Sequence, residues 1–300
     1  MSIHLSYAAR ARHSRIAARV FPRIPATFFA LTFSALAQDT ATIARVLTNT
    51  GAPMKAAFNC ADEDLAASGL ACADDDPCPV YLELSSVSAS GRRLAVAGNL
   101  HGSSVTLYSI LLLSDDGGTT WKEPAARIPG AALEQVQLLD STHAWAAGEL
   151  QVPLPRDPFV LSTRDGGNSW HQTELTEEGG TGAVLRFSFD TPDHGELILD
   201  SGRASSARYS TWESRTAGDS WNATGKTAQV PATRRGAPAM NNEYRLGTDS
   251  ASRSYVIERR NGTGDSWSRI ASFLVQVAGC GTRHLPPPVD ASTEPAVGVK

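Results

Sequence analysis

Four tryptophan residues close short, glycine-rich segments at nearly regular intervals along this chain of 300 residues. We call these segments boxes 1 to 4, and the intervals between their tryptophans are 49, 51 and 46 residues. They span Ser114–Trp121, Thr163–Trp170, Ser214–Trp221 and Arg260–Trp267. Self-similarity at a fixed period of this length is typical of architectures in which each repeat forms one supersecondary unit. We therefore expect an array of similar units of about 50 residues each.

The first two boxes fit the pattern S/T-x-D-x-G-x-T/S-W in full, whereas the third and fourth keep the Gly, the Ser and the Trp. Glycine adopts a positive φ without steric cost, as a tight hairpin requires. An Asp side chain can accept hydrogen bonds from backbone N–H groups across such a turn, and the hydroxyl at the first position can close the same loop. Each Trp is expected to begin the next strand and to bury its ring between neighbouring sheets. We interpret the boxes as structural elements, and not as catalytic or metal-binding ones. The matching residues are Ser114, Asp116, Gly118, Thr120 and Trp121; Thr163, Asp165, Gly167, Ser169 and Trp170; Gly218, Ser220 and Trp221; and Gly264, Ser266 and Trp267.

Strand signals precede each box in a constant order. Short runs enriched in β-branched and aromatic residues are broken by Gly, Asp and Asn, which is typical of four-stranded blades of about 40–50 residues. The sequence therefore predicts an all-β fold, a β-propeller of four-stranded antiparallel blades, with four clear repeats and room for a fifth blade or more. The expected strands are 80–84, 94–98 and 105–113 before box 1; 135–139, 143–148 and 159–161 before box 2; 185–189, 195–199 and 209–212 before box 3; and 244–246 and 254–257 before box 4.

The box pattern resembles the Asp-box, or BNR repeat, of the sialidase-like β-propellers. Residues Asp140–Gly148 also look like the D-x-x-x-G-W-A-V-G signature of the photosystem II assembly and stability factor propellers, and Phe189–Gly195 is similar to the same turn. The resemblance covers Pro79 to Ala278, about two thirds of the chain. Because those propellers are exported and non-enzymatic, the resemblance implies an exported β-propeller without catalytic activity.

The first 37 residues have the composition of a secretory signal. Five Arg and no Asp or Glu accompany an apolar stretch, Ile24–Ser34, that is followed by Ala35-Leu36-Ala37. A basic n-region, a short h-region and an A-x-A site are typical of Sec-type export, so we expect a periplasmic or extracellular protein; cleavage of the leader, or its retention as an anchor, stays open. Without the leader, Lys plus Arg falls from 27 to 22 while Asp plus Glu stays at 31, so the net charge is −9 rather than −4. An acidic chain without a basic stripe disfavours nucleic acid as a partner, and no membrane span is expected after cleavage of the signal.

The four cysteines, Cys60, Cys72, Cys78 and Cys280, are expected to be oxidised in an exported protein. Four cysteines allow three pairings, and the sequence does not choose among them. A Cys72–Cys78 bond with a Cys60–Cys280 bond is attractive, because the second would tie together the two ends of the domain. A zinc site is the competing interpretation, but no C-x-x-C or H-x-x-x-H spacing supports it.

These features divide the chain into four parts. Residues 1–37 form the secretory signal, and residues 38–78 form an N-terminal segment with a Cys-containing acidic loop, which can supply a closing strand or part of a further blade. Residues 79–280 form the β-propeller that carries the boxes. Residues 281–300 form a Pro-rich tail that we expect to be disordered.

No catalytic constellation stands out in the sequence. A sialidase needs three Arg around a carboxylate, a Tyr–Glu pair and an Asp, and the letters of its R-I-P motif at Arg23–Pro25 fall inside the leader. Other glycosidases need two carboxylates facing each other across a sugar, whereas the acidic candidates here are scattered and are interpreted as surface charges. No catalytic, cofactor-binding or metal-binding residue is predicted, and no cofactor. The scattered acidic candidates are Glu83, Glu149, Asp157, Glu196 and Glu213.

The leading hypothesis is an exported, non-catalytic β-propeller that acts as an assembly, stability or protein-interaction module, with an envelope or secreted protein complex as its partner. It depends on the presence of boxes and of the G-W-A-x-G-like turns without a catalytic set. The alternative is a carbohydrate-active propeller, either a lectin or a divergent sialidase-like glycoside hydrolase, with a glycan as its ligand. Trp145 and Trp212 lie outside the boxes and offer rings for sugar stacking, although packing in the core of a blade is the expected position of both.

Overall fold

The computed structural model describes residues 46–61, 69–70, 72–73, 75–151, 157–175, 182–202, 206–232 and 243–281. The chain divides into two compact units, Met1–Thr42 and Ile43–Lys300, so every described residue belongs to the second unit. The expected secretory signal lies outside the described residues, as does the expected Pro-rich tail except for Gly281. Among the described residues, no helix is long and apolar enough to span a bilayer.

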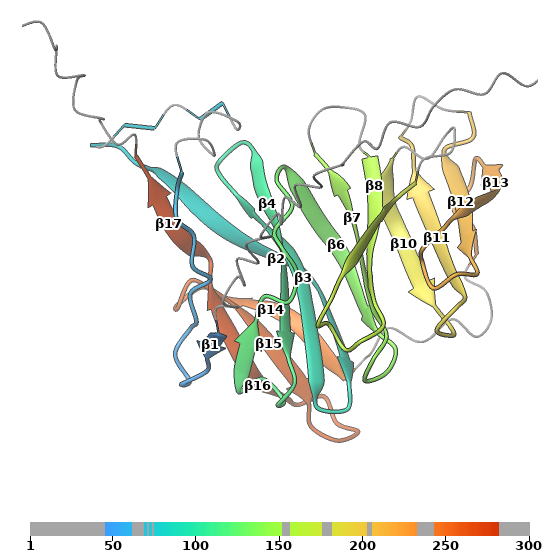
Figure 1. Cartoon of the computed structure of the whole chain (residues 1–300). Helices are drawn as coiled ribbons and strands as arrows, with labels where there is room; N and C mark the ends of the chain where they lie inside the picture. The colour runs from blue at the N-terminus through green and yellow to red at the C-terminus, as the bar shows by residue number, and fades with distance from the viewer. Residues whose placement is uncertain are drawn as a thin grey trace, which may run out of the picture. The chain divides into compact units, whose positions relative to one another are not determined.

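Strands provide all of the regular structure in the described part of the chain (Figure 1). The strands before and after each box fall close to where the sequence predicts them, whereas β17 (Gln276–Cys280) was not predicted; the last strand before each box ends at the first residue of that box. The strands are β1 Val46–Thr48, β2 Cys78–Ser90, β3 Arg93–His101, β4 Thr106–Ser114, β5 Thr120–Lys122, β6 Ala131–Leu138, β7 Ala144–Leu150, β8 Asp157–Thr163, β9 His171–Glu174, β10 Ala183–Phe189, β11 Gly195–Asp200, β12 Tyr209–Ser214, β13 Asn222–Thr227, β14 Tyr244–Asp249, β15 Ser254–Arg260, β16 Trp267–Leu274 and β17 Gln276–Cys280.

These strands form four antiparallel sheets, which we number I to IV along the chain. Sheet I has the order β1-β5-β4-β3-β2-β17, sheet II β6-β7-β8-β9, sheet III β10-β11-β12-β13, and sheet IV β14-β15-β16. Within each sheet, successive strands of the repeat are neighbours, as they are in a propeller blade. The prediction of an all-β propeller built from four-stranded antiparallel blades is confirmed, with sheet I enlarged to six strands and sheet IV reduced to three.

Sheet I is buried on both faces, and alternate side chains of its strands enter different cores. Val96 and Leu112 belong to one buried cluster, whereas their neighbours Ala97 and Leu113 belong to another. Successive side chains of a strand point to opposite faces of the sheet, and a strand with two buried faces appears in the sequence as a continuous apolar run. The run Ile110–Leu113 in β4 therefore reflects burial on both sides.

Three apolar clusters fix which sheets pack together. The first lies between sheets I and IV and includes Trp121 and Phe273, the second lies between sheets I and II and includes Leu111 and Phe159, and the third lies between sheets II and III around Trp145. Within the residues that the structure describes, no such cluster joins sheets III and IV. The sheets therefore pack in the order IV–I–II–III.

Side chains form hydrogen bonds between strands β2, β6 and β10 of neighbouring sheets, where no backbone hydrogen bonds join these strands. The Gln137 amide on β6 donates to the Phe189 carbonyl and accepts from the Phe189 N–H, both at 2.7 Å. Gln135 accepts from the Phe187 N–H at 3.1 Å. On the other side of β6, the Ser88 hydroxyl of β2 accepts from the Leu138 N–H at 2.9 Å. These hydrogen bonds satisfy backbone groups that would otherwise be left unpaired between sheets.

The N-terminal segment crosses from sheet I to sheet IV and covers an edge of each. Strand β1 pairs with β5, and Met54 forms a parallel bridge with Phe273 of β16. Between these two points, the Asn49 side-chain amide donates to the Gly118 carbonyl of box 1 at 3.0 Å and to the Ile270 carbonyl of β16 at 2.7 Å. One short segment thus caps two sheet edges that would otherwise be open to pairing with other chains.

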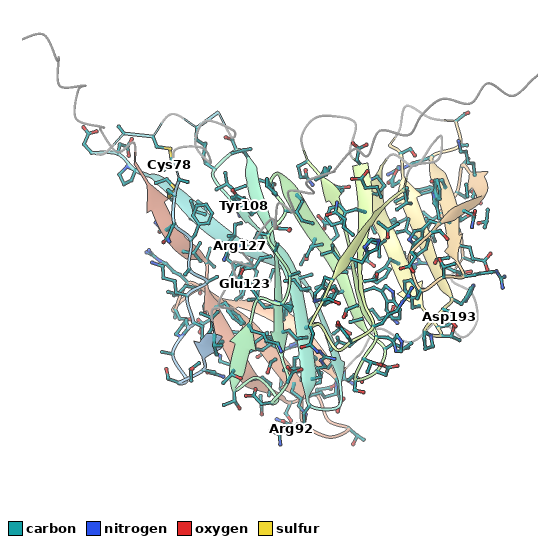
Figure 2. All side chains as sticks on the ribbon, in the orientation of Figure 1. Cys78, Arg92, Tyr108, Glu123, Arg127 and Asp193 are labelled. Atoms are coloured by element: carbon teal, nitrogen blue, oxygen red, sulfur yellow. A yellow bond between two sulfur atoms is a disulfide. The ribbon has the colours of Figure 1, made fainter. Side chains whose placement is uncertain are left out.

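Further along this segment, a half-buried ion pair and a disulfide attach it to the propeller. Arg127 donates to both carboxylate oxygens of Glu123, at 2.8 and 2.7 Å, and also to the Ala57 carbonyl at 2.9 Å; Figure 2 labels this ion pair. Cys60 is bonded to Cys280 at the end of β17, which itself pairs with β2. The last strand and the N-terminal segment are therefore joined to the first sheet by hydrogen bonds and by a covalent bond.

Candidate functional site: box turns, open edges and a polar hollow

Boxes 1 and 2 form the same network of side-chain hydrogen bonds. In box 1 the Ser114 hydroxyl accepts from the Gly118 N–H at 2.9 Å, while Asp116 accepts from the Thr120 N–H at 2.9 Å and from the Thr120 hydroxyl at 2.7 Å. Box 2 repeats this arrangement four residues apart in each case, with Thr163 bound by Gly167 at 2.9 Å and Asp165 bound by the Ser169 N–H at 3.0 Å. The spacing that the two boxes share is therefore explained by hydrogen bonds inside a single turn.

Box 3 keeps this geometry with one substitution. The Ser214 hydroxyl accepts from the Gly218 N–H at 2.9 Å, and the Thr216 hydroxyl takes the place of the Asp by accepting from the Ser220 N–H at 2.9 Å. The sequence pattern did not include Ser214 and Thr216, although both are hydroxyl residues at the right positions. A hydroxyl has fewer acceptor sites than a carboxylate, so box 3 makes fewer bonds of this kind than boxes 1 and 2.

Box 4 departs from the pattern. Its hairpin is closed by a hydrogen bond from the Asn261 N–H to the Ser266 carbonyl at 2.9 Å, and the positive φ of 64° falls on Gly262, not on Gly264. The expected burial of its tryptophan is wrong: Trp267 is partly exposed, with the guanidinium groups of Arg245 and Arg260 at 4.2 and 5.0 Å from the ring centre. Sheet IV is the outermost sheet in the order IV–I–II–III, so no further sheet of the described residues covers this ring.

The glycines of box 1 show why the turn needs that residue. Gly117 and Gly118 both adopt a positive φ, 78° and 94°. A Cβ on Gly118 would lie 2.5 Å from the Cγ2 atom of Ile270 in β16, whereas a Cβ on Gly117 would meet only the end of the Arg92 side chain at 3.9 Å. Gly118 therefore serves both the turn and the close approach of sheet IV.

The aspartates of the boxes are held in the ionised form. Burial acts to raise the pKa of Asp116, but hydrogen bonds from Thr120, Ser114 and Thr119 outweigh it and lower the pKa from 3.8 to about 2. Hydrogen bonds from Ser169, followed by one from Thr163, lower the pKa of Asp165. Both carboxylates accept several hydrogen bonds from their own turn, which stabilises the charged form.

An arginine on one sheet binds the turns of the next sheet at two places. Arg93 of β3 donates to the carbonyls of Ser141 and Gly166, in two turns of sheet II. Arg164 of box 2 donates to the Thr216 carbonyl of box 3 at 2.8 Å and pairs with Asp219 at 2.5 Å. The box turns therefore belong to a continuous polar layer across sheets I, II and III.

Both disulfides among the described residues link cysteines that the sequence singles out. Cys72 is bonded to Cys78, six residues later, and Cys60 is bonded to Cys280, 220 residues later. Disulfides persist in oxidising compartments. The two bonds therefore support an exported protein.

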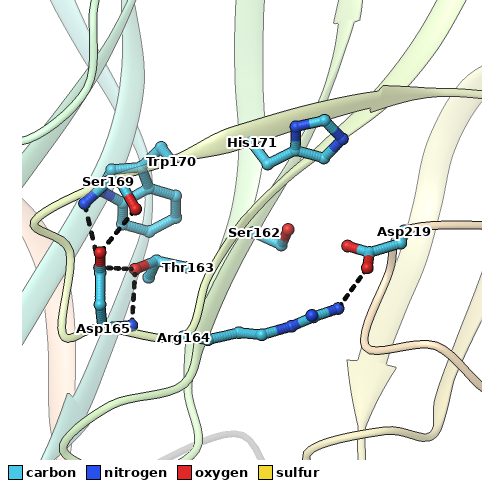
Figure 3. A pocket seen from close by; sticks show the side chains of 8 residues that line it. All are labelled: Ser162, Thr163, Arg164, Asp165, Ser169, Trp170, His171 and Asp219. Atoms are coloured by element: carbon cyan, nitrogen blue, oxygen red, sulfur yellow. Dashed lines mark hydrogen bonds and ion pairs between the residues drawn. The ribbon is translucent and has the colours of Figure 1, made fainter.

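A polar hollow of about 550 Å³ lies beside box 2, facing box 3 (Figure 3). Its walls come from β8, box 2, the start of β9 and box 3. Ser162 and His171 are direct partners across β8 and β9, so their side chains share one face of sheet II. The residues that line the hollow are Ser162, Thr163, Arg164, Asp165, Ser169, Trp170, His171 and Asp219.

The hollow contains polar groups that the turns do not use. Ser162 is only 4% exposed, and its hydroxyl makes no hydrogen bond to any described residue; Figure 3 shows it directed into the hollow. The His171 ring is exposed and likewise has no hydrogen-bond partner within the described residues. Only one carboxylate oxygen of Asp219 pairs with Arg164. These polar groups border open space and have hydrogen-bonding capacity that the described residues do not use, so a ligand can bind there.

No described strand pairs with the outer side of β9 or of β13. Strand β9 is the outer strand of sheet II, and β13 is the outer strand of sheet III, with β8 and β12 as their respective neighbours. In β13, Asn222–Lys226 are all exposed and Thr227 is half-buried. The corresponding edges of sheets I and IV are covered by β1 and Met54. An uncovered edge presents a row of backbone N–H and C=O groups that can pair with another chain.

The tryptophans that we considered for sugar stacking are core residues, as the packing interpretation predicts. Trp145 is fully buried, stacks on Phe189 with a centroid distance of 3.8 Å, and donates its indole N–H to the Ala217 carbonyl at 2.8 Å. Trp212 is 1% exposed and donates to the Ser210 hydroxyl at 3.0 Å. Neither ring is open to a ligand.

The structure also corrects the interpretation of one acidic residue and adds a missed motif. Glu149 is 2% exposed and not a surface charge, because it lies on β7 between Ala132 of β6 and Pro158 of β8; the Gln151 amide donates to it at 2.9 Å. A second R-I-P sequence begins at Arg127, which sequence reasoning passed over. That arginine is engaged with a glutamate and a backbone carbonyl, so its role here is structural.

Comparison with known proteins finds similarity only to solved structures, and only at low sequence identity. No protein-family model matches the sequence, and no curated protein matches it either. Among solved structures, YCF48 bound to a D1 peptide is 17% identical, with a TM-score of 0.37 over 64% of this chain and 56% of that chain. The phage phi92 endosialidase is 11% identical, with a TM-score of 0.39 over 67% and 43%, and the family 117 glycoside hydrolase Zg3597 of Zobellia galactanivorans is 7% identical, with a TM-score of 0.35 over 80% and 76%. The chain thus spans about half the length of YCF48, and its assignment as a β-propeller depends on its own strand order.

Proposed function

We propose that this protein is an exported, non-catalytic Asp-box β-propeller that acts as a protein-interaction module in the assembly or stability of an envelope or secreted complex. The observation that carries this proposal is that no described strand pairs with the outer side of β13, on a chain that covers the matching edges of sheets I and IV with its own N-terminal segment. The partner is an extended protein segment that pairs with β13 as an additional strand. In this mode, main-chain hydrogen bonds supply affinity and alternate side chains supply specificity.

The rest of the molecule supports such a platform. The box turns and the side-chain links between strands hold sheets I to III against one another before any partner arrives, and the two disulfides fasten the N-terminal segment to sheet I. A preformed edge spares part of the ordering entropy that binding otherwise costs. The side chains of β13 are small or flexible and include one charge, Lys226, so they leave access to the backbone.

A proline scan of β13 tests this proposal. Proline removes one backbone N–H, so each of the six positions from Asn222 to Thr227 is substituted in turn. Neighbouring N–H groups of a strand alternate between β12 and solvent. We expect one set of alternate variants to melt at a lower temperature, and the other set to melt normally but to lose the partner that wild-type protein retains from its native envelope.

The result that would contradict strand addition is equally direct. If every normally melting proline variant retains the wild-type partner in stoichiometric amount, the partner does not pair with β13. If the folded wild-type protein retains no partner at all, the protein-interaction function itself is refuted. A second proline scan of β9 serves as the matched control, since β9 is the other open edge and its substitution should leave a β13 partner bound.

The alternative function, a carbohydrate-active propeller, keeps one specific observation in its favour. The rings first considered for sugar stacking are buried, but the hollow beside box 2 combines two other rings, Trp170 and His171, with unused hydrogen-bonding groups. A glycan-binding role is therefore argued from this hollow alone, and without any catalytic step.

A further inference from the structure

We infer that the hollow beside box 2 is a binding site for a neutral, hydroxylated sugar ring of a glycan. This inference deepens the carbohydrate-binding alternative above and is independent of strand addition at β13. The groups that carry it are Ser162, Arg164, Trp170, His171 and Asp219 (Figure 3). None of them except Trp170 was singled out by the sequence, because they come from β8, box 2, β9 and box 3, and Asp219 lies about 50 residues from the others.

The hydrogen-bonding groups of the hollow match a sugar hydroxyl. A hydroxyl both donates and accepts, so it is best satisfied where donors and acceptors lie close together. The second carboxylate oxygen of Asp219 is an acceptor, the guanidinium of Arg164 carries donors, and the Ser162 hydroxyl and the His171 ring can each serve in both ways. The Ser162 hydroxyl faces the hollow and makes no hydrogen bond to any described residue, so a ligand hydroxyl that reached it could form one there.

The charges of the hollow favour a neutral ligand over an anionic one. Arg164 is paired with Asp219 at 2.5 Å and with the Thr216 carbonyl at 2.8 Å, so its charge is already compensated. Asp165 adds a further negative charge, which its own turn holds in the ionised form by lowering its pKa. A carboxylate or phosphate ligand would meet two carboxylates and one compensated guanidinium, which is an unfavourable environment for an anion.

Two flat rings border the same space. Trp170 is half-buried, with one part packed on the cluster between sheets I and II and another part lining the hollow. His171 follows it directly and is exposed. Ligand sites combine apolar or aromatic surface with a few polar groups that fix orientation, and about 550 Å³ lies within the usual range of about 300–1,000 Å³ for such sites.

Titration calorimetry with defined sugars tests the inference. The probes are neutral trisaccharides of glucose, galactose, mannose and xylose, with sialyllactose and a galacturonic acid trisaccharide as anionic comparators. Wild-type protein is compared with Ser162→Ala and His171→Ala, and with Gln172→Ala as the matched control. Gln172 is the next residue of β9, is also exposed, and pairs with Leu161, so it lies on the opposite face of the sheet.

We expect at least one neutral trisaccharide to bind, and the anionic sugars to bind more weakly or not at all. Ser162→Ala and His171→Ala should each weaken binding about tenfold, the effect of losing one buried hydrogen bond, while Gln172→Ala should change it less than twofold. Heat denaturation of all variants checks that they are folded. The hydroxyl of Ser162 makes no hydrogen bond to any described residue, so its removal should leave the melting temperature nearly unchanged.

Four results would overturn the inference. Folded wild-type protein that binds no neutral trisaccharide has no such site, and preferential binding of the anionic sugars makes the hollow an anion site instead. Binding that Ser162→Ala and His171→Ala leave intact places the sugar elsewhere. If these variants lose a protein partner and bind no sugar, the hollow belongs to a protein interface. The β13 proline variants test the proposed protein interaction separately from sugar binding. A partner that is lost only in those variants supports the interaction, whatever the sugar measurements show.

Discussion

Removal of the box 1 tryptophan is the most informative test of how the repeat stabilises the propeller. Trp121 is fully buried between sheets I and IV, donates its indole N–H to the Gly118 carbonyl at 3.1 Å, and meets Phe273 edge-on at 5.4 Å. Strand β1 places Leu47 directly opposite it. Trp121→Ala therefore removes one ring that three parts of the chain share.

The magnitude follows from the buried area. A fully buried indole removes about 200 Å² from water, which is worth about 5 kcal/mol at 25 cal/mol per Å². Residual burial in the unfolded chain reduces this to about 4 kcal/mol, and the edge-to-face contact with Phe273 adds about 1 kcal/mol. We therefore expect Trp121→Ala to lower the free energy of unfolding by about 4–5 kcal/mol, at the upper end of the usual cost of such substitutions.

Guanidinium denaturation followed by circular dichroism measures this loss, with Trp170→Ala as the matched control. Trp170 holds the same position in box 2 but is partly exposed, and its indole nitrogen has no hydrogen-bond partner. It should cost about half as much, because less of its ring is removed from water. A loss below about 1 kcal/mol for Trp121→Ala, or equal losses for the two variants, would refute the assignment of the box tryptophan as an anchor between sheets.

Three further outcomes follow from the box and from the disulfides. Gly118→Ala should destabilise the protein by about 2–3 kcal/mol and Gly117→Ala by about 1 kcal/mol. Both substitutions place a side chain at a positive φ, but only the first also drives a Cβ into sheet IV. Equal melting temperatures for the two variants would contradict this. The folded-state pKa of Asp116, about 2, lies below the ordinary value of 3.8, so its carboxylate stabilises the fold above pH 3.8 and loses this effect as the pH falls towards 2. The difference in unfolding free energy between wild type and Asp116→Asn should therefore narrow between about pH 5 and pH 2, and a constant difference in acid denaturation would argue against the hydrogen bonds described. The double variant Cys60→Ala/Cys280→Ala removes a disulfide between residues 220 positions apart and should lower the free energy of unfolding by about 4 kcal/mol. An unchanged denaturant midpoint would show that hydrogen bonds alone hold the N-terminal segment.

Local chemistry made the boxes and the strands predictable. The hydrogen bonds of a box join residues two to four positions apart, so the identities of Ser114, Asp116 and Thr120, together with the glycines between them, indicate the turn. Apolar, β-branched and aromatic runs predict the strands, and the turn residues between these runs indicate where one strand ends and the next begins. These are short-range effects, and a single sequence displays them directly.

Equivalent residues of different boxes nevertheless differ in burial in the structure. Trp121 is buried whereas Trp267 is partly exposed between two arginines, although both close a box. Glu149 is buried at a position where the sequence indicates only a charge. The difference lies in the neighbouring sheet: sheet I packs between two others, whereas sheet IV shares a core with sheet I alone in the described part of the chain. Burial depends on what packs against a face, which no residue encodes by itself.

The chain alone thus determined the repeat, the turn chemistry and the all-β class, because each depends on contacts between near neighbours in sequence. Only the tertiary structure decided which of three disulfide pairings forms, which sheet edges the N-terminal segment covers, and where the hollow beside box 2 lies. Ser162 and Asp219 are 57 residues apart and meet only because sheets II and III pack together. Contacts at that separation depend on the packing of whole sheets, and the open groups they leave in the hollow and along β13 are the ones available for binding.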